Sequence, residues 1–318
     1  MIEGDKLLLN LKKYKKTGRG IRKYWQIYIL LIPVVVWFIT FCYYPMYGVI
    51  IAFKDYYPKL GIFGSPWAGN GGWQHFIWLF HTTGFTRALK NTIIISALKL
   101  LICFPFPIML SLFLNEIVNA KLKKSIQTAI YLPYFISWVV ISGIVYNILA
   151  VNGGILNNIR LMMGLDRVSY ITQSENFYVI LLLSEIWKNA GWGTVIYIAG
   201  MSGIDPTLYE AAEIDGAGRF KRMRHITVPC ISPIIITMFL LQVGNILNAG
   251  FDSIFNLYNA SVYDVADILD TYAYRIGIAQ GEVEKASALG LFKAIINFAL
   301  LISSNFIVKR VTGQGLYD

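Results

Sequence analysis

The chain alternates long apolar runs with short polar segments. A helix needs about 20 mostly apolar residues to cross the hydrocarbon core of a bilayer, which is about 30 Å thick, and six runs qualify. The fifth run is the least uniform, because Gln242, Asn245 and Asn248 cluster near its end. The pattern predicts an all-α integral membrane protein with six transmembrane helices, at residues 25–44, 92–114, 126–149, 177–198, 231–247 and 286–308.

The composition agrees with a location in the bilayer. Of the 318 residues, 56% are hydrophobic and 14% are charged, whereas about 25% are charged in soluble domains. The net charge of +10 does not indicate nucleic-acid binding, because the basic residues lie between apolar runs and form no patch on a polar domain. We therefore expect the lipid bilayer as a partner and no nucleic acid.

The basic residues also predict the orientation. Most of the 28 lysines and arginines lie in residues 1–24 or in loops on the same side of the membrane, so the positive-inside rule places both termini in the cytoplasm. The first apolar run is too long for a signal peptide and lacks a small-residue cleavage site. We expect a basic cytoplasmic segment at 1–24, a six-span domain at 25–308 and a cytoplasmic tail at 309–318.

The residues that most often carry catalysis or bind metals are sparse. The three cysteines, Cys42, Cys103 and Cys230, lie in or beside apolar runs and have no CxxC spacing, and the three histidines are scattered. The sequence therefore predicts no catalytic residue, no metal site and no disulfide framework.

One polar segment between the fourth and fifth apolar runs is unusually rich in charge. Asp205 followed by Pro206 favours a helix start, and the next residues favour a helix at 206–215. Gly216 and Gly218 permit a sharp turn before a second, basic helix at 219–225, which Pro229 is expected to separate from the fifth span. By itself this segment is also compatible with a solvated loop that only sets the topology.

The order of residues in this segment resembles a known signature. Residues 210–229 read EAAEIDGAGRFKRMRHITVP, which matches EAA, three residues, G, nine residues, I, one residue and LP, with Val228 in place of the leucine. This signature is typical of the permease subunits of binding-protein-dependent ABC importers. The stretches YYPMYGVIIAFKDYYP, FTRALKNTIIIS, YLPYFISWVVISGIVYNIL and EIWKNAGWGTVIYIAGMSGIDPTLYEAAEIDGAG are similar to the branch that imports sugars, particularly polysaccharide-derived oligosaccharides.

The resemblance implies a type I importer fold in a bacterial inner membrane and a non-catalytic transport subunit that works by alternating access. It implies a second permease subunit, two ATPase subunits and an extracellular solute-binding protein as partners. No GxxxxGK[ST] occurs in the chain, so ATP and Mg are expected on the partner ATPase and no cofactor on this chain. By carry-over, the loop at 204–229 contains the coupling helix that docks on the ATPase, with docking residues Tyr209, Glu210, Ala211, Ala212, Glu213, Asp215 and Gly216.

Polar groups inside the spans are candidates for the sugar route, because they are costly unless they line a cavity or pair with one another. Sugars stack on aromatic rings and need partners for their hydroxyl groups. The candidates are Tyr134, Trp138, Tyr146, Asn147, Trp187, Asn189, Trp192, Gln242, Asn245 and Asn248. Ordinary helix packing and hydrogen bonds between helices are the alternative roles of these residues.

The ionisable residues in the spans are open to similar alternatives. Glu185 and Lys188 are three positions apart and can pair on one helix or with another helix. Lys99 and Lys293 lie inside the bundle or extend toward the membrane interface.

Two other functions are alternatives to an importer. A lipid-linked glycosyltransferase needs an acidic or metal-binding cluster near a membrane face, and its nearest candidates are Asp252, Asp264, Asp267 and Asp270. The spacing of the last three is equally compatible with one polar helix face. A secondary transporter predicts inverted repeats, and none is evident in the sequence.

Overall fold

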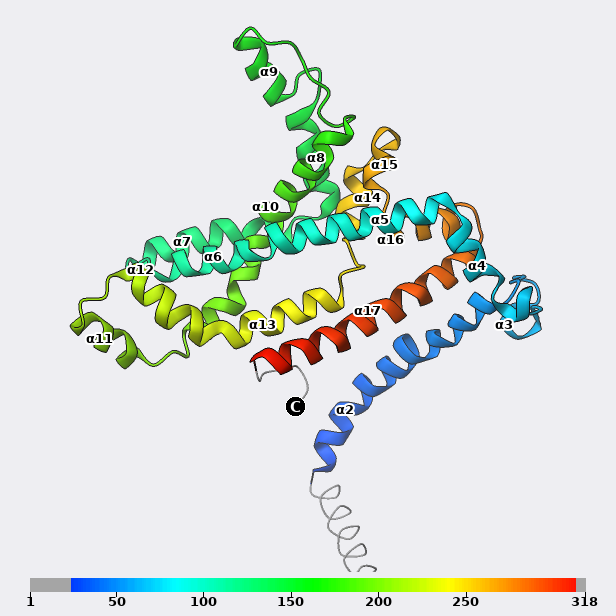
Figure 1. Ribbon diagram of the computed structural model, residues 1–318, viewed down its shortest axis with the longest axis horizontal. Coiled ribbons are helices and arrows are strands. Elements are labelled where there is room, and N and C mark those ends of the chain that lie inside the picture. Colours follow the sequence, from blue (N-terminus) through cyan, green and yellow to red (C-terminus); the bar gives the residue numbers. More distant parts are fainter. Residues whose placement is uncertain (1–23, 313–318) are drawn as a thin grey trace, which may run out of the picture.

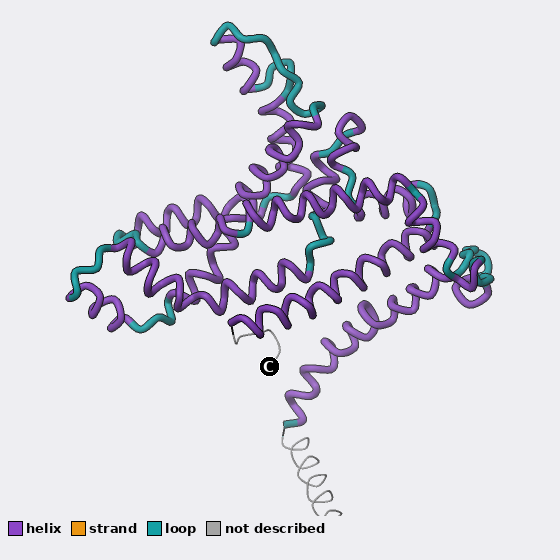
Figure 2. The backbone as a smooth tube through the Cα atoms, viewed as in Figure 1, coloured by secondary structure: helices purple, strands orange, loops and turns teal. Residues whose placement is uncertain are grey.

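A computed structural model describes residues 24–312. Figure 2 shows that this part of the chain is built of helices joined by loops, and its β-structure is one isolated antiparallel bridge between Lys54 and Trp67. The all-α prediction is therefore confirmed for these residues. The predicted cytoplasmic segment at 1–24 and the end of the predicted tail, 313–318, lie outside the described residues, apart from Tyr24.

The first and last long helices pack side by side. Helix α2 (Trp25–Phe38) continues through a π-helical turn, η1 (Ile39–Tyr43), into the 3-10 segment η2 (Tyr44–Phe53), so the first helix is longer than predicted. Helix α17 (Val283–Thr312) packs against η2. The side chains of α2 are exposed on all sides, as expected for a helix that faces lipid or another protein.

The second long helix runs over Thr83–Asn115, through α5 (Thr83–Leu98), the π-helical turn η4 (Lys99–Cys103) and α6 (Pro105–Asn115). The predicted third span at 126–149 is not one continuous helix. Helix α7 (Ala120–Tyr131) with η5 (Leu132–Phe135) meets α8 (Trp138–Leu149) at an angle of 101°.

This break has a local cause. Pro133 stands near the start of η5, and Ile136 is extended, so the helical hydrogen bonding stops there. The Ser137 hydroxyl then accepts a hydrogen bond from the Val140 backbone N–H and begins α8. The third span is thus two helices joined by a sharp turn.

Helix α10 (Ser174–Met201) contains the predicted fourth span. It approaches α7 closely at Gly191, where a Cβ atom would lie 1.9 Å from the Ile130 carbonyl oxygen. The charged loop that follows carries α11 (Pro206–Ile214), as predicted.

The next helix differs from the prediction that Pro229 separates a basic helix from the fifth span. The structure has one continuous helix over Arg219–Gly244, formed by α12 (Arg219–Arg222), the π-helical turn η6 (Met223–Thr227) and α13 (Val228–Gly244). Pro229 lies in the first turn of α13, where the preceding π-helical turn changes the hydrogen-bond register and the absent N–H is tolerated.

By length and composition, four helices in residues 24–312 can cross a membrane: Trp25–Phe53, Thr83–Asn115, Arg219–Gly244 and Val283–Arg310. The bent pair α7–η5 and α8 brings the number to five if it is one span. Helix α10 is not among them, since Glu185, Lys188 and Asn189 interrupt its apolar run. The count of six and the cytoplasmic location of both termini therefore remain predictions. In Figure 1, α2 begins and α17 ends on the same side of the molecule.

Short helices form the two ends of the bundle. Figure 1 shows α11 at the far left and α3 (Gly61–Gly64) with α4 (Gln74–His81) at the far right. The remaining short segments are η3 (Asn70–Gly72), α9 (Ile155–Met162), α14 (Phe251–Leu257), η7 (Ala260–Val262), α15 (Tyr263–Ala266), α16 (Leu269–Tyr274) and η8 (Arg275–Ala279).

Three apolar clusters hold these elements together. Phe85, Leu269 and Leu289 are central to the first, between α5, α16 and α17. The second joins α5, α10 and the segment from α14 to Ile268, and the third joins α10 to α13. No residue of α11 is buried, so the described contacts contribute little apolar burial to this helix.

Candidate functional site

A polar cavity of about 420 Å³ lies among η4, α6, α10 and α13. Lys99 comes from the π-helical turn η4, Glu185 and Asn189 from α10, and Gln242 and Asn245 from the end of α13 and the residue that follows it. Three of the predicted candidates, Asn189, Gln242 and Asn245, are thereby brought together. We refer to this space as the inner cavity.

An ion pair lies at the wall of the inner cavity. The Lys99 Nζ donates to Glu185 Oε1, to the Ala249 carbonyl oxygen at 2.7 Å and to Ser253 Oγ at 3.2 Å. The other carboxylate oxygen of Glu185 accepts from Asn189 Nδ2. Glu185 therefore pairs with a lysine on another helix, and among the described residues it forms no ion pair with Lys188.

A second space of about 600 Å³, the outer cavity, adjoins the break between η5 and α8. Its lining includes Tyr134 and Trp138 from the broken span, Lys188 from α10, and Asp252 and Asn256 from α14. Two predicted candidates, Tyr134 and Trp138, are thus combined with a lysine, a carboxylate and an amide.

A further predicted candidate supports the outer cavity. The Trp192 ring stacks on Tyr134, with ring centroids 4.7 Å apart and an interplanar angle of 11°. Such stacked aromatic pairs restrict the orientation of both rings. Trp192 therefore fixes one of the aromatic walls.

The remaining predicted route residues lie elsewhere. The Tyr146 hydroxyl donates to the Leu257 carbonyl oxygen at 3.2 Å, and Asn147 Nδ2 donates to the Gly143 carbonyl oxygen at 2.9 Å within its own helix. Asn248 Nδ2 donates to Asn245 Oδ1 at 3.0 Å, beside the inner cavity. Trp187 is half exposed and lines neither cavity.

Polar residues outside the predicted sugar route also line the cavities, among them Lys99, Glu185, Lys188, Asp252 and Asn256. Lys99, Glu185 and Lys188 could have been added, because an ionisable side chain inside an apolar run is itself a signal. Asp252 and Asn256 carry no such signal, since they follow the fifth apolar run and reach the cavity only through the fold.

Helix α11 is exposed and capped at both ends. The Thr207 backbone N–H donates to Asp205 Oδ1 at 3.0 Å and holds the pKa of Asp205 below its usual range. Gly216 ends the helix with φ of +77°, a conformation that favours glycine. The predicted helix and turn are both confirmed, since α11 covers Pro206–Ile214.

The predicted docking residues divide into two groups. The Tyr209 hydroxyl lies 2.9 Å from Thr227 Oγ1, and Glu213 Oε2 accepts from Arg222 Nη1 at 2.8 Å, so these two attach α11 to the next helix. Glu210 is exposed and has no side-chain partner among residues 24–312. Ala211, Ala212, Asp215 and Gly216 also form a largely exposed surface.

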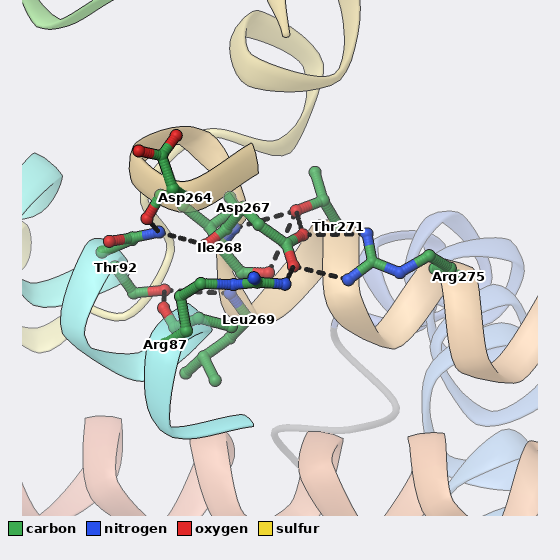
Figure 3. Close-up of polar contacts among 10 residues, drawn as sticks. Arg87, Thr92, Asp264, Asp267, Ile268, Leu269, Thr271 and Arg275 are labelled. Atoms are coloured by element: carbon green, nitrogen blue, oxygen red, sulfur yellow. Dashed lines mark hydrogen bonds and ion pairs between the residues drawn. The ribbon is translucent and has the colours of Figure 1, made fainter. Parts of the chain in front are cut away.

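A buried carboxylate organises the segment from α15 to η8 (Figure 3). Asp267 is 0% exposed and accepts from Arg275 Nη1 at 3.1 Å, from Arg275 Nη2 and from Thr271 Oγ1 at 2.9 Å, while Arg87 Nη2 lies 3.8 Å away. The hydrogen bonds to Asp267 raise the pKa of Arg275. We call this group the outer clasp.

Side chains of α5 attach the outer clasp through hydrogen bonds to its backbone. Asn91 Nδ2 donates to the carbonyl oxygens of Asp264 and Asp267 at 3.0 and 3.1 Å, and the Leu269 N–H donates to Thr92 Oγ1 at 2.9 Å. The expectation of a single polar helix face for the aspartates is wrong, because α15 ends at Ala266 and Asp267 is extended.

The other two aspartates have their own partners. Asp264 accepts from Ser174 and Asp270 pairs with Lys293, and the described residues contain no cluster of three or more His, Cys, Asp or Glu side chains suited to a metal.

Cavities with polar groups between the helices of an apolar chain are typical of membrane transport proteins. The chain belongs to the family of binding-protein-dependent transport system inner membrane components, whose family model matches residues 104–313.

Curated relatives match nearly the whole chain. The polygalacturonan/rhamnogalacturonan transport system permease protein YteP of Bacillus subtilis (strain 168) is 40% identical over 313 residues, which are 98% of this chain and 97% of that protein. Protein LplB of the same organism is 40% identical over 308 residues, covering 95% of this chain and 96% of that protein.

Solved structures agree with the family assignment. A chain of a bacterial ABC transporter involved in the import of the acidic polysaccharide alginate is 39% identical, with a TM-score of 0.85 over 93% of this chain and 99% of that chain. A chain of the alginate transporter in complex with an alginate pentasaccharide-bound periplasmic protein is 38% identical, with a TM-score of 0.85 over 94% and 99%.

Proposed function

We infer that the chain is the permease subunit of an ATP-driven importer that moves oligosaccharides into a bacterial cell across the inner membrane. The observation that carries this proposal is the pair of cavities, in which aromatic rings and hydrogen-bonding groups lie together between the helices. The curated relative named for polygalacturonan and rhamnogalacturonan transport supports a saccharide as the cargo.

The sugar route includes both cavities. Tyr134 and Trp138 offer ring faces to the CH faces of a sugar in the outer cavity. The Asp252 carboxylate accepts hydrogen bonds from the sugar hydroxyl groups, and the Asn256 amide both accepts and donates them. Asn189, Gln242 and Asn245 offer amides in the inner cavity. An intramembrane polar group that lines a cavity is typical of a substrate path.

A second permease subunit completes the route. Gln242 and Asp252 are exposed, and their side chains have no hydrogen-bond partner among residues 24–312. Lipid cannot satisfy these groups, so a partner protein or a water-filled cavity must cover them. A second permease subunit supplies the partner protein, and the two subunits together enclose the water-filled cavity.

Energy for transport comes from partner subunits that bind ATP and Mg, because this chain has no GxxxxGK[ST]. Helix α11 docks on the ATPase, and Glu210 and the small Ala211 and Ala212 form the contact surface. Closure of the ATPase pair on ATP then moves α11, and with it α10 and the helix over Arg219–Gly244, between outward-open and inward-open states. The extracellular binding protein delivers the sugar to the outward-open state.

The test is to replace Glu210 with lysine and to co-express the chain with its chromosomal neighbours. We expect normal membrane insertion, a lower yield of copurified ATPase and at least tenfold slower sugar uptake, because the exposed carboxylate becomes a cation at the contact. Glu175→Lys, at an exposed glutamate on the first turn of α10, is the matched control. Unchanged ATPase yield and uptake in Glu210→Lys would contradict the docking role.

A further inference from the structure

Lys188 and Lys54 are buried lysines without a carboxylate partner among the described residues, and of the two only Lys188 lines one of the two cavities. Lys99 pairs with Glu185, Lys293 with Asp270 and Arg275 with Asp267, so each of these has a carboxylate partner. Lys188 is 8% exposed and forms no ion pair within residues 24–312. A buried cation without a counter-ion is costly, which makes its surroundings informative.

The protein compensates this charge only partly. The Lys188 Nζ donates to the Tyr134 carbonyl oxygen at 2.9 Å and to the Ile136 carbonyl oxygen, at the break of the third span. It also lies 5.6 Å from the centroid of the Tyr134 ring and 5.7 Å from that of Trp138. Carbonyl dipoles and ring faces stabilise a cation, but they leave its net charge in place.

The space beside Lys188 is large enough for a ligand. The side chain lines the outer cavity of about 600 Å³, together with the two aromatic residues and Asp252 and Asn256 of α14. An ammonium group has three donors, and two of them bind the carbonyl oxygens. The third donor can therefore serve a ligand in the cavity.

We propose that Lys188 supplies the counter-charge for the carboxylate of an acidic saccharide, which makes oligosaccharides of uronic acids the substrate class of this route. The proposal rests on the importer function proposed above. The carboxylate of the sugar accepts from Lys188, and the pyranose ring lies against Trp138 or Tyr134.

Asp252 orients the same sugar. Its carboxylate has no ion-pair partner in the part of the chain that the structure describes, and it repels a second anion. Hydroxyl groups therefore face Asp252 and Asn256, while the carboxylate faces Lys188. A neutral sugar satisfies the hydroxyl contacts but leaves Lys188 without a carboxylate in direct contact, so the site discriminates against it.

The experiment compares two ligands of nearly equal shape on the complete importer in lipid nanodiscs. Trigalacturonate carries the carboxylates, and its fully methyl-esterified form keeps the rings and hydroxyl groups but loses the charge. Equilibrium binding to the assembled complex without binding protein isolates the transmembrane route. We expect the wild type to bind the acid at least tenfold more tightly than the ester, the usual scale for a charge-assisted contact with little water.

Substitutions then assign the preference to Lys188. Lys188→Met is expected to weaken acid binding by about tenfold or more and to change ester binding by less than about twofold. Lys188→Arg is expected to keep the preference, because it retains the charge. Lys285→Met removes a lysine that is paired with Glu282 outside both cavities. It is expected to leave the affinity for both ligands unchanged.

The outcomes separate this proposal from the importer function. Equal affinity of the wild type for acid and ester, or equal loss of both in Lys188→Met, overturns the role of Lys188 and leaves oligosaccharide import standing. If Lys188→Met does not assemble, two results can still overturn the role of Lys188. One is equal affinity of the wild type for acid and ester, and the other is loss of the preference for the acid in Lys188→Arg. Binding of neither ligand, together with no uptake of any oligosaccharide, would overturn the importer function itself.

Discussion

The outer clasp and helix α11 use charged residues in opposite ways. In the outer clasp, Asp267 is fully buried, and its partners Arg275, Thr271 and Arg87 all belong to the same chain. In α11, no residue is buried, and Glu210 has no partner in residues 24–312. Ile214 at the end of α11 is 88% exposed, although it is apolar.

The difference separates residues that hold this chain together from residues for which we propose a contact with a partner. A charge whose partners lie within the chain holds elements together, and its loss is expected to appear as lost stability. A charge and an apolar side chain left exposed on a short helix are expected to contribute little to stability and to act through another molecule. The two cavities lie between these extremes, since Lys99 is paired within the chain and Lys188 is not.

The largest effect is expected for Asp267→Asn. The change leaves the Arg275 guanidinium without its counter-charge and should lower the free energy of unfolding by about 3 kcal/mol, the lower end for breaking a buried pair, because Arg275 is partly exposed. The measurement is a denaturant titration of the purified protein. Asp264→Asn is the control, with an expected change within about 0.5 kcal/mol, because its side chain only accepts from Ser174 at the surface. Equal effects of the two changes would contradict the structural role of the outer clasp.

A smaller effect is expected from the pair in the inner cavity. Glu185→Leu and Lys99→Met should each lower stability, since each leaves one partly buried charge unpaired. The double variant should recover part of the loss, with an interaction free energy of about 2 kcal/mol in a double-mutant cycle measured by the same titration. If the two single losses simply add, Lys99 and Glu185 do not stabilise each other. Lys99 then behaves like Lys188, which has no carboxylate partner, and not like Arg275, which has one.

The smallest effect is expected at the turn after α11. Gly216→Ala places a side chain at φ of +77° and should cost about 1 kcal/mol locally, which corresponds to roughly fivefold weaker association with the ATPase. The unfolding free energy of the chain should hardly change, because α11 is not part of the apolar core. Copurification of the ATPase at graded expression levels measures the association.

Gly218→Ala is the matched control for the turn. Gly218 has φ of −67°, and a Cβ atom meets nothing within 4 Å at either glycine. We expect Gly218→Ala to leave the association unchanged. Equal weakening by both substitutions would show that the turn geometry is not what matters at this surface.

Local signals in the sequence predicted α11 well. Asp205 and Pro206 gave its start and Gly216 its end, because capping and backbone conformation depend on near neighbours. The same reasoning failed at Pro229, where a π-helical turn absorbs the proline, and at the third span, where Pro133 and Ser137 interrupt a run that is apolar throughout. Hydropathy measures polarity and does not register a bend between two apolar helices.

The candidate site was predictable only in part. Aromatic and amide residues inside apolar runs indicated a polar route, and five of the ten candidates line one of the two main cavities. Which of them share a cavity depends on contacts between segments far apart in the chain, such as Lys99 with Glu185 and Ala249. Asp252 and Asn256 gave no local signal at all, because α14 folds back against α8 and α10.

The sequence by itself determined the helical class, the apolar segments, the family and helix α11, because each depends on composition or on residues close together in the chain. Only the tertiary structure decided which charges are satisfied. It buried Asp267 among its arginines, joined Lys99 to Glu185 and left Lys188 beside an open cavity. The physical reason is that an ion pair or a cavity is formed by segments from different parts of the chain, whose approach is fixed by packing and not by local sequence.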